Sequence, residues 1–210
     1  MRVSMSLMVL ATLWAVPGCG QPTTTESPVA EYVFELPPTS AVPTFELPLT
    51  IPQAYRAIPH KRTEFDPTYS KVPEPERAYL TLMFRLVDEA VAVRVSALRA
   101  FSSGDRNSAA IEQYETLINF VETIEPPPTL SQYHSDLRSA LQVQQAFFKD
   151  WRTQGSGFAH KGNGYRNHPQ VKAASGHLIS AHQQLVQAFP HEDSVNKDAF
   201  FDHHCALDFI

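Results

Sequence analysis

From Glu76 to the C-terminus, apolar residues recur at intervals of three and four positions. This spacing places them on one face of a helix and is typical of helices that bury one side. Ser102, Ser103 and Gly104 interrupt the first run, the prolines at 126–128 end the second, and Gly155 ends the third. The pattern predicts four long helices and one short one, over residues 76–101, 105–125, 129–154, 169–189 and 193–207.

The positions of the breaks favour particular helix ends and a particular fold. Asp105 is suited to be the N-cap of the second helix, and Pro169 to be the first residue of the fourth. A looser segment, 154–167, carries four glycines and is expected to be a loop. Because short links favour antiparallel neighbours, the sequence predicts an all-α fold, an antiparallel four-helix bundle with a short C-terminal fifth helix.

The segment before the bundle has a different composition. Residues 20–75 are rich in proline, threonine, serine and glutamate. Proline removes backbone donors and restricts the preceding residue, so we expect a mostly irregular stalk without helices. The motif Phe34-Glu35-Leu36-Pro37 recurs as Phe45-Glu46-Leu47-Pro48. Chance or packing against the bundle is the favoured reading of this repeat, and docking tags for a partner are the alternative.

The N-terminus carries an export signal. Arg2 is followed by an apolar run from Val3 to Val16 and then by small residues, the order of a secretory signal peptide. The sequence Val16-Pro17-Gly18-Cys19 resembles the lipobox of bacterial lipoproteins. The resemblance implies a signal peptide over 1–18, a lipid-bearing Cys19 that attaches the protein to a membrane, a stalk over 19–75 and a bundle domain over 76–210.

The same resemblance implies a location in the bacterial cell envelope. Gly20 follows the cysteine where some inner-membrane members have Asp, which favours the outer membrane over the inner one. An ordinary signal peptide cut near Gly18 or Gly20, or an uncut anchor, stays open as an alternative.

Charge and cysteine content limit the remaining function classes. The formal net charge is −5 and the Lys and Arg residues are scattered, so no patch for nucleic-acid phosphates is expected. The two cysteines are Cys19 and Cys205. If Cys19 carries lipid, Cys205 is a free thiol and the mature chain has no internal disulfide.

Candidate metal ligands gather near the C-terminus, where histidines are frequent. His203, His204 and Cys205 are adjacent, and His177 and His182 lie on the preceding helix. These side chains are ligand types for zinc or copper, so we consider a metal site at these five positions. The favoured alternative makes His203 a hydrogen-bonded core residue, His204 an exposed one and Cys205 a small buried apolar one.

Aromatic residues on the third helix suggest a second candidate site. Phe147 and Phe148 are adjacent and cannot both point fully inward, and Trp151 lies one turn further on. An exposed cluster of these three side chains would be a partner-binding surface. A wide apolar face that meets two neighbouring helices is the favoured alternative.

Motifs of catalysis are missing from the chain. It contains no Glu-x-x-His pair of a di-iron bundle, no Cys-x-x-Cys-His haem attachment, and no His-Glu-x-x-His or Gly-x-Ser-x-Gly motif. We therefore expect a non-catalytic envelope lipoprotein whose bundle interacts with a protein partner, without a cofactor. The alternative is a lipoprotein that binds a metal or small ligand through the C-terminal His and Cys residues.

Overall fold

The computed structural model describes residues 35–58, 60–155 and 164–209, which are helical or irregular throughout. They belong to one compact unit, Phe34–Ile210. The expected signal peptide and Cys19 lie outside the described residues, as do Phe34 of the first repeat and most of the glycine-rich loop. The helices are α1 (Ile51–Ala57), α2 (Glu74–Ser102), α3 (Ala110–Glu122), α4 (Ser131–Gln154), α5 (Pro169–Ala188) and α6 (Ser194–Leu207), with short 3₁₀ turns at Thr39–Ala41, Pro128–Leu130 and Tyr165–Asn167.

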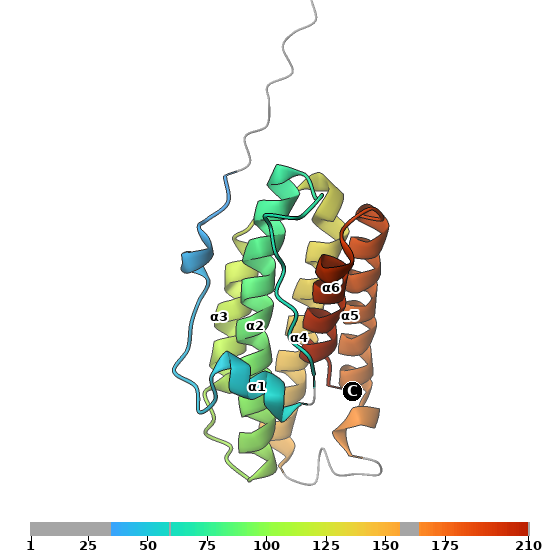
Figure 1. Ribbon diagram of the computed structural model, residues 1–210. Helices are drawn as coiled ribbons and strands as arrows, with labels where there is room; N and C mark the ends of the chain where they lie inside the picture. Colours follow the sequence, from blue (N-terminus) through green and yellow to red (C-terminus); the bar gives the residue numbers. More distant parts are fainter. Residues whose placement is uncertain (1–34, 59, 156–163, 210) are drawn as a thin grey trace, which may run out of the picture. The chain divides into compact units, whose positions relative to one another are not determined.

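Helices α2 to α5 form the predicted bundle, and α6 completes it (Figure 1). Consecutive helices pack against each other from α2 through α5, and α6 packs against both α5 and α2. The short C-terminal helix therefore closes the bundle between its first and fourth long helices. This position explains why α6 is buried on more than one side, including Asn196, His203 and His204.

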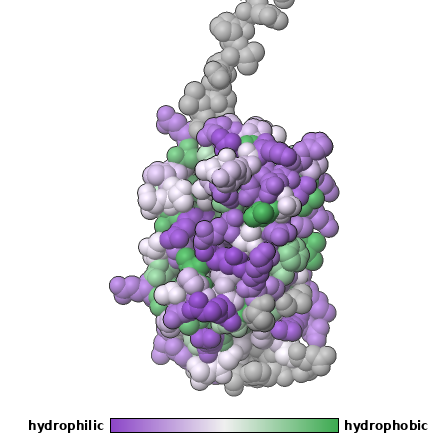
Figure 2. All heavy atoms as spheres, viewed as in Figure 1, coloured by the Kyte–Doolittle hydropathy of each residue, from purple (hydrophilic) through white to green (hydrophobic). Residues whose placement is uncertain are grey.

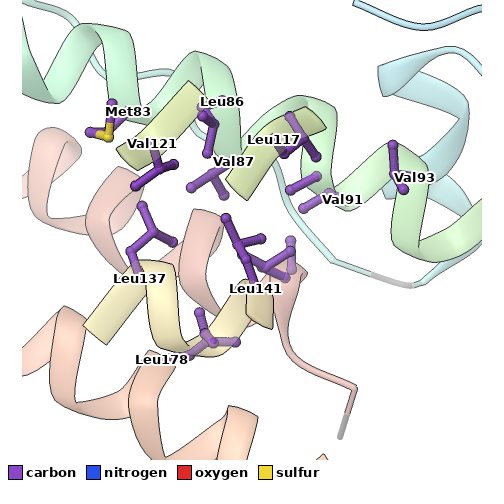
Figure 3. Close-up of a cluster of buried hydrophobic side chains, with 14 of the residues drawn as sticks. Met83, Leu86, Val87, Val91, Val93, Leu117, Val121, Leu137, Leu141 and Leu178 are labelled. Carbon is purple, nitrogen blue, oxygen red and sulfur yellow. The ribbon is translucent and has the colours of Figure 1, made fainter. Parts of the chain in front are cut away.

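One continuous hydrophobic core lies between these helices. Figure 3 shows a part of it, where Val87 and Leu86 of α2 meet Leu117 of α3, Leu141 of α4 and Leu178 of α5. These side chains are at most 1% exposed. Burial of each one contributes about 1.5–3 kcal/mol to the free energy of folding, so the core is the main source of stability.

Most helix ends lie where the sequence predicted them. Pro169 is in the first turn of α5, and the Asp193 side chain accepts a hydrogen bond from the backbone N–H of Val195 (2.8 Å) at the start of α6. The expected N-cap at Asp105 is wrong, because α3 begins at Ala110. The Asp105 carboxylate instead accepts from the N–H of Asn107 (2.9 Å), a local turn that competes with helix formation.

The proline-rich segment differs from the expected stalk. It contains α1, so the expectation that no helix forms there is wrong. Pro52 stands in the first turn of α1, where a backbone N–H has no partner within the helix and proline is tolerated. The Gln53 side chain accepts from the N–H of Thr50 (2.9 Å) and completes the helix start.

This segment also packs on the bundle. Val42, Tyr55 and Val72 are at most 3% exposed, and Phe45 and Leu47 of the second Phe-Glu-Leu-Pro motif contact the core. Packing within the domain is thus confirmed for the second copy of the repeat. A boundary at residue 75 does not separate this segment from the bundle, because the compact unit extends to Phe34.

Candidate functional site

Two adjacent histidines on α6 point to different parts of the molecule. His203 is 2% exposed, and its Nε2 lies 3.5 Å from Oδ1 of Asp88 on α2. His204 faces α5, where its ring centroid lies 6.4 Å from that of His182. Neighbouring residues on a helix differ by about 100° in direction, so the two rings cannot share one site.

A pocket of about 210 Å³ opens between α5 and α6 beside His204. His182 and Cys205 contribute to its wall, and the His182 ring meets the edge of Phe201 at 5.7 Å. The remaining wall is mainly apolar. This pocket unites three of the five residues considered as metal ligands, and we take it as the candidate site.

His204 supplies the most unusual polar atom of this site. Its Nδ1 lies 2.5 Å from the carbonyl oxygen of Phe200, and since a carbonyl can only accept, Nδ1 carries the proton. Its Nε2 is then an unprotonated acceptor, and it has no hydrogen-bond partner among the described residues. Burial lowers the pKa of His204 to about 3, so the ring is neutral at physiological pH.

His182 and Cys205 are also uncharged in this environment. Burial lowers the pKa of His182, which is half-buried. Burial raises the pKa of the Cys205 thiol, and the carboxylates of Asp208 and Asp202 raise it further. The Cys205 Sγ lies 3.9 Å from Nε2 of His60. Because the reactive form of cysteine is the thiolate, this environment opposes a nucleophilic role.

The five candidate metal ligands do not converge on one point. His177 pairs with Asp136 (Nδ1–Oδ1 3.2 Å), and His203 with Asp88, while the other three line the pocket. Across residues 35–58, 60–155 and 164–209, no three His, Cys, Asp or Glu side chains are arranged to hold a metal ion. The favoured alternative is right for the buried His203. It is wrong for His204, which is 3% exposed, and for Cys205, which is only partly buried. Closure of the bundle by α6 explains the burial of His204.

The aromatic residues of α4 belong to the core. Phe147, Phe148 and Trp151 are at most 2% exposed, and the rings of Phe148 and Trp151 are stacked. Phe209, after the end of α6, packs on Phe147 at 5.2 Å between ring centroids. An exposed partner surface made of these three side chains is therefore not formed, because neighbouring aromatic residues cover both sides of α4.

The exposed apolar residues lie elsewhere. Ile179 of α5 and Phe201 of α6 are 54% and 53% exposed, and both line the pocket. Val186, one further heptad along α5, is also exposed. Figure 2 shows a mainly hydrophilic face with hydrophobic residues along the edge formed by α5. The α5–α6 surface, defined by Ile179 and Phe201 on the pocket wall and by Val186 two turns further along α5, thus combines exposed apolar side chains with a cavity.

Sequence reasoning missed a buried polar network next to His203. Asp88 on α2 accepts hydrogen bonds from Tyr55 and Arg62, both in the proline-rich segment. The acidic pair Asp88 and Glu89 interrupts the apolar pattern of α2. This interruption is the sequence feature that could have indicated a buried polar network. Both acidic residues are at most 4% exposed.

No match was found to a family model, to a curated protein or to a solved structure. Of the helices that the structure describes, none is both long and apolar enough to cross a membrane.

Proposed function

We propose that this protein is a non-catalytic lipoprotein of the bacterial cell envelope whose helical domain binds a partner protein through the α5–α6 surface. The observation that carries the proposal is the pair of exposed apolar side chains, Ile179 and Phe201, on the wall of an apolar pocket. Exposed apolar side chains around a cavity are typical of interaction sites, where they anchor the contact.

The size of the pocket indicates what it accepts. A cavity of about 150 Å³ holds a benzene molecule, so about 210 Å³ has room for one aromatic or branched side chain. A partner side chain inserted between α5 and α6 would also cover Ile179 and Phe201. The mainly apolar wall favours an aromatic or branched apolar side chain.

Lipid attachment at Cys19 would hold this surface near the membrane. The proposal rests on the lipobox-like residues Val16 to Cys19. A single acyl chain gives only marginal membrane binding, so firm anchoring requires more than one. Labelling with radioactive palmitate tests it: we expect incorporation into the native chain and none into Cys19→Ser.

Photo-crosslinking in the producing cells tests the binding function. A photoreactive phenylalanine analogue at Phe201 should form one discrete adduct. The same analogue at Glu115, an exposed position on α3, is the matched control and should form none. Equal adducts at both positions, or none at Phe201, would contradict a specific interface.

A small-ligand function is the second candidate, and the pocket of about 210 Å³ between α5 and α6 favours it. Native mass spectrometry of the purified protein separates the candidates. A stoichiometric added mass that is lost in His204→Phe supports a ligand, whereas a bare mass together with the Phe201 adduct supports the partner protein.

A further inference from the structure

A second polar site lies at the C-terminal end of α6, around Arg94. This arginine is in the second half of α2 and is 2% exposed. Its Nη2 donates to the carbonyl oxygen of Ala206 at 2.6 Å, and its guanidinium lies 5.7 Å from the ring centroid of Phe209. Its Nε has no hydrogen-bond partner among the described residues.

Within the part of the chain that the structure describes, Arg94 forms no ion pair with a carboxylate. Burial lowers the pKa of Arg94, and nearby groups, including Asp208, offset this only in part. A buried charge is costly unless it is paired, so an unpaired buried arginine points to an anion that completes the site.

The contact with Ala206 does not remove this requirement. It satisfies a free carbonyl at the C-terminal end of α6, where the helix dipole is equivalent to about half a negative charge. One such contact uses one of the five N–H donors of a guanidinium. The helix dipole and one hydrogen bond therefore neutralise the guanidinium only in part, and its Nε–H keeps no partner among the described residues.

A pocket of about 240 Å³ adjoins Arg94. Arg166 and His60 line it as further donors, and Asp208 is its acidic residue, whose Oδ2 accepts from Ser175 Oγ at 2.7 Å. Ile58 and Leu98 form part of the apolar wall. The pocket thus has two guanidinium groups against one carboxylate, together with apolar side chains.

We propose that this pocket binds a small organic carboxylate, with the carboxylate group on Arg94 and Arg166 and the apolar part against Ile58 and Leu98. A guanidinium forms two parallel hydrogen bonds to a carboxylate, and such charge-assisted bonds are strong in a buried setting. The apolar wall favours a ligand with one charged end over a fully solvated inorganic anion. This pocket shares Asp208 with the α5–α6 pocket, but its two arginines do not line that pocket, so the inference does not depend on the proposed function.

Calorimetric titration of the full-length protein in a nonionic detergent tests the proposal, with benzoate as the probe. Benzamide is the matched control ligand, since it has the same shape without the charge. We expect benzoate to bind at least about tenfold more tightly than benzamide or phosphate, which corresponds to about 1.4 kcal/mol. Equal affinities, or no binding of benzoate, would overturn the proposal.

Variants of the two pocket arginines test whether benzoate binds in this pocket. Arg166→Gln at the exposed rim and Arg94→Lys, which keeps the charge without the planar fork, should each weaken benzoate at least about fivefold, a loss of about 1 kcal/mol. Arg152→Gln, at an arginine that pairs with Glu112 on α3, is the control and should bind as the native chain does. Circular dichroism shows whether each variant is folded, and unchanged affinity in a folded Arg166→Gln would contradict the assignment.

Discussion

The guanidinium of Arg62 donates to both carboxylate oxygens of Asp88, with Nη2–Oδ2 at 2.6 Å and Nε–Oδ1 at 3.3 Å. The Tyr55 hydroxyl donates to the same Oδ1 at 2.8 Å. Arg62 and Tyr55 belong to the proline-rich segment, and Asp88 lies in the middle of α2. This buried carboxylate is therefore one of the points that attach the proline-rich segment to the bundle.

Loss of the Asp88 carboxylate should weaken the packing of the proline-rich segment on the bundle and lower the stability of the domain. In Asp88→Asn, Arg62 keeps its ion pair with Glu64 but loses its charged partner on α2, and breaking such a largely buried pair costs about 3 kcal/mol. For a domain of this size, we expect a drop in melting temperature of about 6–12 °C. Thermal unfolding followed by circular dichroism measures it. Asp105→Asn, at an exposed loop position, is the control and should change stability by less than about 0.5 kcal/mol.

Glu192 makes a second attachment, at the other end of the segment. One carboxylate oxygen accepts from Ser70 Oγ and from the N–H groups of Lys71 and Val72, all at 2.8–3.0 Å. Glu192→Gln replaces a charged acceptor and should cost about 2 kcal/mol. Hydrogen exchange should become faster at Lys71 and Val72. Unchanged exchange at these two amides would contradict this role, and Glu115→Gln on α3 is the matched control.

Acid should destabilise the domain through its buried histidines. The pKa of His204 falls from 6.5 to about 3 on folding, so between these values the unfolded chain binds the additional proton. Stability from this group is complete above pH 6.5 and falls by about 1.4 kcal/mol per pH unit down to about pH 3. Burial also lowers the pKa of His203, which acts in the same direction.

Urea unfolding at pH 7 and pH 5 measures this effect. His204→Phe cannot take up the proton, so its stability should depend less on pH than that of the native chain. An NMR titration provides a check that does not require the variant to fold. A His204 ring that titrates near pH 6.5 in the folded protein would refute the prediction.

Phe148 and Phe201 allow a core position to be compared with a surface position. Phe148 is fully buried, whereas Phe201 is 53% exposed. Phe148→Ala should lower the free energy of unfolding by about 3–5 kcal/mol, because it leaves a cavity. Phe201→Ala should change it by less than about 0.5 kcal/mol while it weakens partner binding. A large loss of stability in Phe201→Ala would show that this side chain is part of the core.

The long helices and the fold class follow from local patterns in the sequence. Apolar spacing along α2, α4 and α5 is a local signal, and Pro169 and Gly155 mark helix ends through backbone geometry that neighbouring residues do not alter. The proline content of residues 20–75 predicted no helix there, and α1 was missed. Pro52 stands in the first turn of α1, where proline is tolerated.

The tertiary structure alone decided which polar residues meet. Asp88 and Arg62 are 26 positions apart, and Arg94 and Ala206 are 112 apart. Nothing local in the sequence specifies these pairs. His204 was expected at the surface, and it is buried because α6 packs on both α5 and α2. Helix periodicity depends on residues a few positions apart, whereas burial, counter-charge and pockets depend on which helices become neighbours, and only the folded chain determines that.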